Sequence, residues 1–224
     1  MTRIVAGELG GRTIAVPPKG TRPTSDRVRE AIFSRLAHLG VLDDARVLDL
    51  YTGSGALGLE AASRGAASVT LVDSARPATD VARRNVAALG LASVRVVTET
   101  AERYAAALAG TGPRTRTSTG TSTGPDAGAA LDLVFLDPPY DLDDATLGSV
   151  LTHLAAPGVL ADGAVVVVER STRTPEPAWP AGLAAFARKD YGETAVYYAE
   201  PVPAEPSDST EPSDSTGPSD SVGA

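Results

Sequence analysis

Cysteine is absent from all 224 residues of the sequence. This absence excludes disulfides and thiolate metal sites, and it fits a reducing cytoplasm, which is where we expect the protein to act. Histidine is scarce as well, because only His38 and His153 occur, far apart and without a companion carboxylate motif. We therefore expect no metal site, and we expect both histidines to lie on helix surfaces or at helix boundaries.

Long hydrophobic runs are also missing. The longest aliphatic run, Val165–Val168, is far shorter than the ~20 residues that a membrane-spanning helix needs. Arg3 is followed by glycine-rich polar sequence, so we expect no signal peptide and no membrane partner. Aromatic residues make up only 4%, but 42% of the residues are hydrophobic, which at this length supports one sizeable core.

Charge is unevenly distributed along the chain. The formal net charge of −8, taken alone, argues against a nucleic-acid partner. Residues 1–40, however, hold seven Lys and Arg against three acids, whereas residues 200–224 hold six acids and no base. The basic front is compatible with RNA, although an ordinary solvated helix face would look the same.

Two segments have low complexity. EPSDST occurs at 205–210 and again at 211–216, and such sequence lacks the apolar side chains that would offset the entropy of ordering. We predict a disordered acidic tail over 201–224. The Thr- and Gly-rich residues 110–128 predict an expanded, dispensable surface loop between two elements of the core.

Strand-like and helix-like patterns alternate between these segments. This alternation predicts an α/β fold with a Rossmann-like, mostly parallel, doubly wound sheet. Residues 187–200 differ, because two β-prone runs flank a Tyr-Gly turn, and they predict an antiparallel hairpin at the end of the sheet. The predicted strands are 46–50, 68–73, 94–98, 131–136 and 163–169, and the predicted helices are 55–64, 75–90, 101–109 and 143–156.

Residues 1–40 form an N-terminal extension to the main domain, which we place at 41–200. The extension begins with a predicted small hairpin that turns at 7–11, followed by a helix capped by Thr24 or Ser25 and closed by Gly40. Arg27 and Arg35 should face solvent or a ligand. The apolar residues at helical spacing, which should pack on the core, are Val28, Ile32, Phe33 and Leu36.

Residues 53–58 read GSGALG, a G-x-G-x-x-G pattern that serves any nucleotide lying across a strand-to-helix turn. Asp49 lies four residues before Gly53, where a carboxylate would repel the pyrophosphate of a dinucleotide. It would suit a cationic ligand such as S-adenosylmethionine, which carries an ammonium and a sulfonium but no phosphate. Gly53 and Gly55 would let the backbone approach this ligand closely.

Asp73 ends the second predicted strand and favours nucleoside binding. A carboxylate at this place can accept hydrogen bonds from both ribose hydroxyls, as it does in NAD-binding proteins. Because NAD-binding proteins use the same carboxylate, Asp73 does not distinguish between the two cofactors. A solvated acid at a strand end is the alternative interpretation of Asp73. An NAD-dependent oxidoreductase therefore stays open as an alternative.

Residues 136–140 read LDPPY, directly after the predicted strand 131–136. Pro138 and Pro139 have no N–H and hold the backbone extended, so that Asp137 and the Pro138 carbonyl can point into the cleft at the end of the strand. Tyr140 can stack on a planar base, a contact worth about 1–3 kcal/mol. A surface turn is the alternative, which the position of this motif after a core strand disfavours.

An acceptor pair beside an aromatic ring suits the exocyclic amine of a nucleobase. Hydrogen bonds from the amine to Asp137 and to the Pro138 carbonyl would localise its lone pair and take up developing positive charge, without a metal. The base must be extruded or already unpaired. This chemistry alone does not separate guanine N2 from adenine N6 in DNA or in another RNA, and a non-catalytic RNA-binding module also stays open.

The chain resembles the bacterial 16S rRNA (guanine-N2)-methyltransferase family that modifies guanine 966. RPTSDRVREAIFSRL, VLDLYTGSGALGLEAASRGA, LVD, LDPPY and YGET carry the resemblance, which covers about residues 2–199. The LDPPY box is shared with many amino-methyltransferases, whereas the N-terminal block is more specific. The resemblance implies a class I methyltransferase fold, S-adenosylmethionine as methyl donor, and 16S rRNA in a partly assembled 30S subunit as partner.

The resemblance also implies roles for particular residues. The segment that contains Thr24 would lie close to the donor and the RNA. The other residues implied to bind the donor are Asp49, Tyr51, Gly53 and Gly55, with Asp73 at the ribose. The residues implied to form the amine site are Asp137, Pro138, Pro139 and Tyr140.

One departure from the family concerns the adenine of the donor. In the family, the third strand is commonly followed by an acid and an alanine, and the acid reaches the adenine. Here VVTETAERY places Thr100 before Ala101, with Glu99 one position early. We expect a backbone N–H or the Thr100 hydroxyl to make this contact instead.

Overall fold

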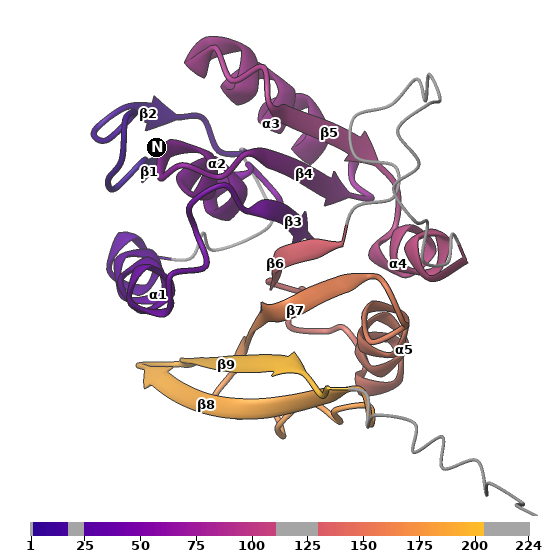
Figure 1. The fold of residues 1–224 in the computed structure, drawn as a ribbon. Helices are drawn as coiled ribbons and strands as arrows, with labels where there is room; N and C mark the ends of the chain where they lie inside the picture. Colours follow the sequence, from indigo (N-terminus) through magenta and orange to yellow (C-terminus); the bar gives the residue numbers. More distant parts are fainter. Residues whose placement is uncertain (1, 18–24, 111–129, 204–224) are drawn as a thin grey trace, which may run out of the picture.

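A computed structural model describes residues 2–17, 25–110 and 130–203. Within these ranges the chain folds around a seven-stranded sheet with the order β5-β4-β3-β6-β7-β9-β8 (Figure 1). The first five strands in this order are parallel, and β9 runs antiparallel to both of its neighbours, β7 and β8. The strands are β3 (Arg46–Leu50), β4 (Ser68–Asp73), β5 (Val94–Thr98), β6 (Leu131–Leu136), β7 (Leu160–Ser171), β8 (Leu183–Tyr191) and β9 (Thr194–Pro201).

Helices cover both faces of the sheet, as the alternating pattern predicted. Helices α1, α2 and α3 contribute to one apolar core, and α4 and α5 contribute to a second core on the opposite face. These helices are α1 (Asp26–Leu39), α2 (Ala56–Ser63), α3 (Arg76–Leu89), α4 (Ala101–Gly110) and α5 (Asp144–Leu154). The predicted Rossmann-like, mostly parallel sheet with a terminal antiparallel hairpin is confirmed.

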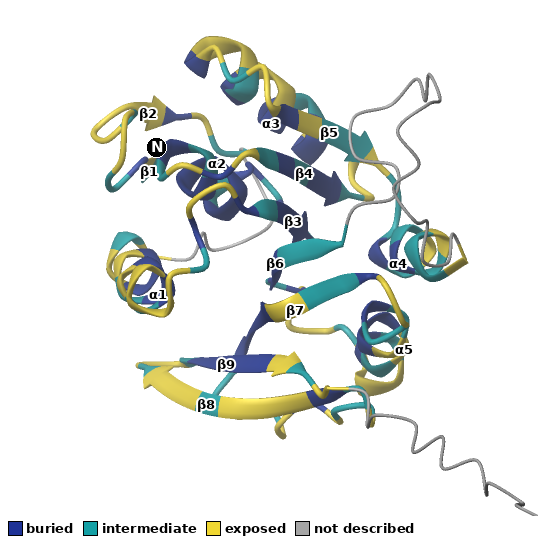
Figure 2. Ribbon diagram, in the orientation of Figure 1, coloured by how far each residue is buried: buried dark blue, intermediate teal, exposed yellow. Residues whose placement is uncertain are grey.

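Alternate side chains of each central strand enter opposite cores. In β3, Val47 belongs to the core under α1–α3, and Leu48 belongs to the core under α4 and α5. Strands buried on both faces read as nearly continuous apolar runs, which is why the sequence indicated them so clearly. Figure 2 shows β3 and much of β4 in dark blue, with exposed residues on the outer surfaces of the helices and on β8.

The N-terminal hairpin pairs β1 (Thr2–Arg3) with β2 (Thr13–Ile14) and is anchored on α2 by Glu60. The Glu60 side chain is fully buried and accepts hydrogen bonds from the Val5 and Ala6 backbone N–H groups, at 2.6 and 3.0 Å. Its carboxylate also accepts from Arg64 Nε at 2.8 Å. The extension is therefore held by a buried polar contact as well as by the apolar side chains Ile4 and Ile14.

Asn85 on α3 connects the hairpin to the glycine loop. Its side-chain amide accepts from the Ala15 N–H, and it donates both to the Ala15 carbonyl and to the Ser54 carbonyl, each at 2.9 Å. The chain leaving β2 is thereby fixed against the loop that carries Ser54. Neither Glu60 nor Asn85 was singled out from the sequence.

Helix α1 begins and ends where the sequence indicated. The Ser25 side chain accepts from the Val28 N–H, and Gly40 closes the helix at φ 72°. Arg27 is exposed as expected, but Arg35 is not turned to solvent or into a ligand cavity. Its guanidinium lies over the rings of Tyr198 and Phe186, 4.8 and 5.7 Å from their centroids, so it docks α1 on the C-terminal hairpin.

Several predicted boundaries move by a few residues. Helix α2 is one residue shorter at each end than the predicted range 55–64, with Gly55 and Arg64 as its caps, and Gly65 follows at φ 103°. Strand β7 is longer than predicted at both ends, because it pairs with β6 from Leu160 and with β9 as far as Ser171. The low-complexity segment and the acidic tail lie outside the described residues except at their edges, where Gly110 ends α4 and Pro201 ends β9. No helix in the described ranges is long and apolar enough to cross a membrane.

Candidate functional site

Acidic side chains gather where the parallel strands end. Leu50, Val72, Leu136 and Val168 pair with one another across β3, β4, β6 and β7. The residues that follow them are therefore level with one another at the carboxyl edge of the sheet, which is where α/β folds bind ligands. Three of these following residues are acidic: Asp73, Asp137 and Glu169.

Asp49 lies in β3, one residue before Leu50, and is almost completely buried. Only 1% of Asp49 is exposed, and its Oδ2 accepts from the Thr52 hydroxyl at 2.7 Å and from the Gly58 N–H at 2.9 Å. Its other oxygen, Oδ1, is buried and accepts no hydrogen bond from the described residues. A buried acceptor without a partner is costly, and a cationic group would satisfy it.

The proton affinity of Asp49 supports the same conclusion. The pKa of its carboxyl is raised to about 7, mainly by burial and also by the carboxylates of Asp137 and Asp73, against the hydrogen bonds from Thr52 and Gly58. These two electrostatic contributions place the three acids within reach of one another. The cleft therefore accumulates negative charge, which opposes a pyrophosphate and suits an ammonium or a sulfonium.

The glycine loop owes its shape to three glycines with different roles. Gly53 has φ 56°, and its N–H donates to Asp73 Oδ2 at 2.9 Å. A Cβ on Gly55 would lie 2.9 Å from the Leu71 side chain, so protein packing excludes a larger residue there. A Cβ on Gly58 would lie 2.3 Å from Leu71 and 2.9 Å from Val69, so the third glycine lets α2 pack closely on β4.

Tyr51 has an unusual backbone conformation. Its φ is 62°, which is uncommon for a residue with a bulky side chain and marks local strain where the loop leaves β3. The ring packs against the core under α4 and α5, and its hydroxyl donates to Glu102 Oε1 at 3.2 Å. Tyr51 thus links the end of β3 to α4.

Asp73 and Thr100 lie on adjacent strand ends. Asp73 is partly exposed and accepts from the Gly53 N–H and, at 2.8 Å, from the Ala75 N–H. Because Asp73 pairs with Thr98, Thr100 follows two residues beyond the same level. The Thr100 hydroxyl accepts from the Arg103 N–H at 3.3 Å as a helix cap, and it retains a proton that can be donated to a ligand.

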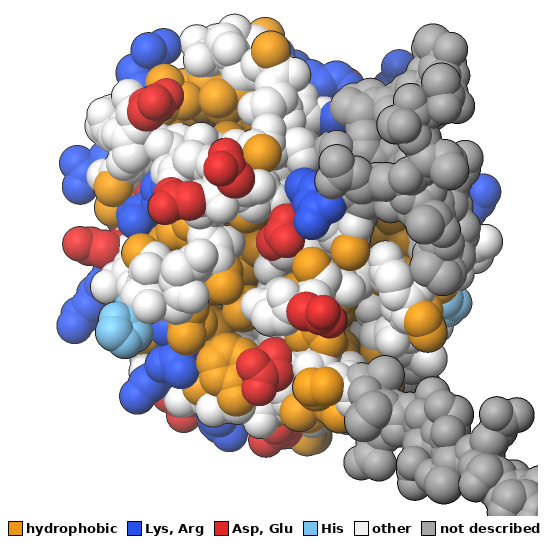
Figure 3. Space-filling model, viewed as in Figure 1, with side chains coloured by type: hydrophobic (Ala, Val, Ile, Leu, Met, Phe, Trp, Pro, Cys, Tyr) orange, Lys and Arg blue, Asp and Glu red, His pale blue; other side chains and the backbone are white. Residues whose placement is uncertain are grey.

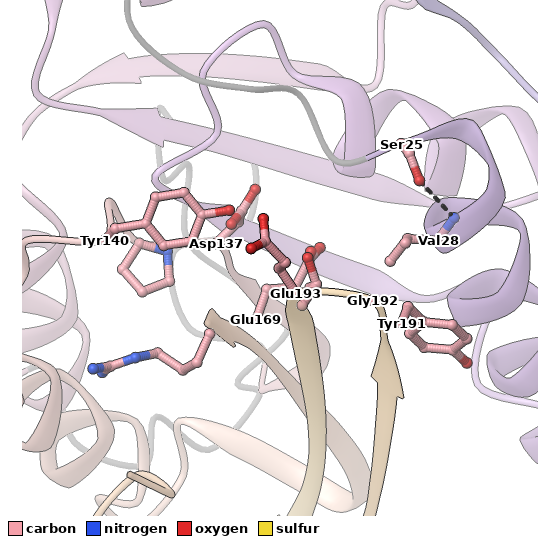
Figure 4. Close-up of a pocket in the computed structure, with 11 residues that line it drawn as sticks. Ser25, Val28, Asp137, Tyr140, Glu169, Tyr191, Gly192 and Glu193 are labelled. Carbon is pink, nitrogen blue, oxygen red and sulfur yellow. Dashed lines mark hydrogen bonds between the residues drawn. The ribbon is translucent and has the colours of Figure 1, made fainter. Parts of the chain in front are cut away.

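Three residues of the LDPPY motif line a cavity of about 290 Å³ (Figure 4), whose wall includes none of the described residues predicted to bind the donor. Asp137, Pro138 and Tyr140 form part of its wall, whereas Pro139 is exposed and does not line it. Tyr140 is 69% exposed, so its ring is available to a base that enters from solvent. The structure therefore brings three of the four predicted amine-site residues to one cavity.

The rest of the cavity wall is formed by residues that were not predicted from the sequence to belong to the site. Ser25 and Val28 of α1, Glu169 and Arg170 of β7, and residues 191–194 of the β8–β9 turn complete it. Glu169 could have been recognised, because it ends the apolar run AVVVV as Asp73 ends its strand. Thr24, predicted near the donor, lies outside the described residues.

S-adenosylmethionine fits the cleft on these observations. The unpartnered Asp49 Oδ1 and the acidic surroundings suit its cationic methionine part, and Asp73 lies where a ribose would be contacted. In the described parts of the chain, no group of three His, Cys, Asp or Glu side chains could hold a metal ion. The cofactor expected from the sequence therefore agrees with the geometry.

The surface around the site carries both signs of charge. Arg3, Arg12 and Arg27 of the extension are exposed. Figure 3 shows Lys and Arg side chains along the margin formed by the N-terminal hairpin and α1, whereas acidic side chains lie nearer the middle of this face. The basic margin borders the cavity, since Ser25 and Val28 of α1 line it.

A family model described as conserved hypothetical protein 95 matches residues 2–200. The chain belongs to this family. It is 36% identical over 194 residues to ribosomal RNA small subunit methyltransferase D of Escherichia coli (strain K12), covering 86% of each chain. It is 32% identical over 198 residues to the putative rRNA methyltransferase YlbH of Bacillus subtilis (strain 168), covering 87% of this chain and 96% of that protein. These matches confirm the predicted family resemblance.

Solved structures of similar proteins support the family and the fold. The putative methyltransferase yhhF of Escherichia coli superposes with a TM-score of 0.71 at 33% identity, covering 89% of this chain and 97% of that one. The magnesium protoporphyrin IX methyltransferase of Synechocystis, solved with S-adenosylmethionine bound, has a TM-score of 0.55 over 79% of each chain. At 12% identity, this second likeness shows the fold alone.

Proposed function

We propose that this protein transfers a methyl group from S-adenosylmethionine to the exocyclic N2 amine of a guanine in 16S rRNA. The observation that carries the proposal is the Asp137–Pro138–Tyr140 wall of the cavity, level with Asp73 and in electrostatic contact with Asp49. The similarity to ribosomal RNA small subunit methyltransferase D favours small-subunit rRNA as substrate. We place the reaction in the cytoplasm, on a partly assembled 30S subunit.

The donor would be held by its cationic and ribose groups. Asp49 would accept from the ammonium, Asp73 from the ribose hydroxyls, and Thr100 or a neighbouring backbone N–H would reach the adenine. Bound S-adenosylmethionine supplies an electrophilic methyl group at the sulfonium. The glycine loop at Gly53 and the strained Tyr51 shape the backbone on which the donor lies.

The amine site would act by positioning and by accepting hydrogen bonds. Asp137 and the Pro138 carbonyl would accept from the two N–H groups of the amine, which keeps its lone pair out of the ring and directed at the methyl group. As the nitrogen gains positive charge, the same acceptors stabilise it. Tyr140 would stack on the extruded base, and its exposure in the ligand-free protein leaves the ring accessible.

The main alternative is methylation of adenine N6 in DNA or in another RNA, because the LDPPY chemistry serves either amine. Purified protein and tritiated S-adenosylmethionine should be incubated with naked 16S rRNA, partly assembled 30S particles and duplex DNA. We expect label in the rRNA of the particles, recovered as N2-methylguanosine after digestion. Label confined to DNA, or recovered as N6-methyladenosine, would contradict the proposal.

Asp137→Ala is the matched test of the amine site. Removing the carboxylate should lower kcat by about 10²- to 10⁴-fold, because positioning and charge stabilisation are both lost. The variant should still bind the donor in isothermal titration, since Asp49 and Asp73 are unchanged. A turnover rate like that of the unmodified protein would remove Asp137 from the mechanism.

A further inference from the structure

Glu169 is a buried carboxylate in the cavity wall that the proposed reaction does not use. It is 4% exposed and belongs to β7. Because Leu136 pairs with Val168, Glu169 is level with Asp137 on the neighbouring strand. The residues two before them, Val167 and Phe135, both belong to the core under α1–α3, so the pleat directs Glu169 to the face to which Asp137 belongs.

We propose that Glu169 reads the N1–H of the target guanine and thereby excludes adenine. This inference rests on the proposed function. The edge of guanine that carries the N2 amine also carries N1–H, a hydrogen-bond donor, directly beside it. In adenine, the ring nitrogen beside the N6 amine is N1, which carries no proton and is an acceptor. An ionised carboxylate only accepts hydrogen bonds. It can therefore bind the N1–H of guanine, whereas it cannot bond to the unprotonated N1 of adenine.

The acceptors at the ends of two neighbouring strands match the two neighbouring donor groups of the base. Asp137 and the Pro138 carbonyl serve the amine, and Glu169, one strand further along the sheet, serves the ring N–H. A carboxylate has about four acceptor positions, so this hydrogen bond adds to the contacts that Glu169 makes with the protein. Figure 4 shows Asp137, Tyr140 and Glu169 around the same cavity.

The other charged side chains of the cavity wall are engaged differently. Arg170 follows Glu169 on β7, its side chain therefore projects to the opposite face, and its Nη2 donates to Asp144 of α5 at 2.8 Å. Glu193 in the β8–β9 turn is 67% exposed and accepts from Arg173 at 2.7 Å. An acceptor that meets the wrong base costs more free energy when it is buried. Glu169 is buried and Glu193 is exposed, so Glu169 discriminates between bases more strongly than Glu193.

The test uses a base that keeps the amine but lacks the ring proton. 2-Aminopurine carries the exocyclic amine at the same position as guanine, and its N1 is an acceptor. Two 16S rRNAs, made by splint ligation with guanine or 2-aminopurine at the target position, are assembled into 30S particles, and kcat/KM for methyl transfer is measured on each. For the unmodified protein we expect a preference for guanine of at least about a hundredfold.

Glu169→Gln supplies the decisive comparison. The side-chain amide can accept from N1–H or donate to an unprotonated N1, so the preference should fall to about tenfold or less, while donor affinity in isothermal titration stays unchanged. Glu169→Asp keeps the charge on a shorter side chain, and it should lower the rate but retain the preference. Glu193→Gln, the same change at an exposed carboxylate of the cavity, should leave the ratio within about twofold of the original.

The outcomes separate this inference from the proposed function. If the unmodified protein methylates 2-aminopurine as fast as guanine, or if Glu169→Gln keeps the original ratio, Glu169 does not read N1–H, although guanine methylation stands. If no N2-methylguanosine forms on the guanine particles, the proposed function fails and the inference fails with it. The first of these measurements needs no variant, so a Glu169 variant that does not fold leaves the inference testable.

Discussion

Asp49 makes the donor site depend on pH. In the ligand-free protein, burial raises its pKa to about 7, so the carboxyl is largely protonated below that pH. A cationic donor prefers the ionised form, and its affinity should rise about tenfold between roughly pH 5.5 and pH 7. Isothermal titration with S-adenosylmethionine across this range measures the rise. In Asp49→Asn the affinity should be weaker and should change little with pH. An equally steep rise in that variant would show that a group other than Asp49 causes the pH dependence.

The same carboxyl should affect stability in the opposite direction. Its pKa is higher in the folded protein, about 7, than the ordinary value of 3.8 that applies when the chain is unfolded. The folded state therefore binds more protons in this window, and the stabilisation that is complete below pH 3.8 is lost as the pH rises to about 7. Urea unfolding without donor should show that the free energy of unfolding falls across the window more steeply for the unmodified protein than for Asp49→Asn.

Gly58 sets the distance between α2 and the sheet. Gly58→Ala should lower the free energy of unfolding by about 1–3 kcal/mol, because its Cβ would overlap Leu71 and Val69. Gly148→Ala is a matched control inside α5, where no described atom lies within 4 Å of the new Cβ. It should stabilise the protein by about 0.5–1 kcal/mol, since alanine favours helix. Urea unfolding of both variants checks the difference, and a neutral Gly58→Ala would contradict this packing.

The role of a single residue could be predicted from the sequence where the residue belongs to a recognisable motif. It could not be predicted where the surrounding sequence carries no motif. Asp49 is the last residue but one of an apolar strand, Asp73 ends one and Asp137 follows one, and this pattern placed them at one edge of the sheet. Glu60 and Asn85 stand in ordinary helical sequence, and their partners in the N-terminal extension lie 54 to 70 residues away. Nothing local distinguishes a buried helical Glu that binds backbone N–H groups from one that faces solvent.

At the scale of elements, the N-terminal hairpin depends on α2. Glu60→Ala would leave two backbone N–H groups and Arg64 without their acceptor, at a cost of about 3 kcal/mol. Hydrogen exchange at the Val5 and Ala6 amides should accelerate more than exchange in β3 and β4. Glu30→Ala, an exposed change on α1, should alter stability by less than about 0.5 kcal/mol. Unchanged protection at Val5 and Ala6 in Glu60→Ala would show that apolar contacts alone hold the hairpin.

Elements of the parallel sheet were predictable almost to the residue, because apolar runs of 5 or 6 residues between helices have few other interpretations. The ends of β7 and β8 were less accessible to sequence reasoning. Their lengths are set by pairing with β9, which is a long-range contact that local pattern does not encode. The position of Arg35 over two aromatic rings was missed for the same reason, since the rings lie on strands more than a hundred residues away.

At the scale of the whole molecule, the sheet order brings distant segments to one cavity. The donor loop follows β3 and the amine site follows β6, which are neighbouring strands of the sheet. The turn of the C-terminal hairpin, residues 191–194, lines the same cavity as the start of α1. The extension is therefore part of the site rather than an appendage. The alternation of strand and helix indicated a parallel sheet, whereas the order of its strands comes from the structure.

The central claim is that this cleft methylates guanine N2 in 16S rRNA through Asp137. The most direct measurement is mass-spectrometric mapping of methylated nucleotides in 16S rRNA from cells that lack the gene and from the same cells carrying either the unmodified gene or Asp137→Ala. We expect one N2-methylguanosine to disappear in the deletion, to return with the unmodified gene, and to stay absent with Asp137→Ala at equal protein level. An rRNA methylation pattern that is unchanged by the deletion would contradict the account.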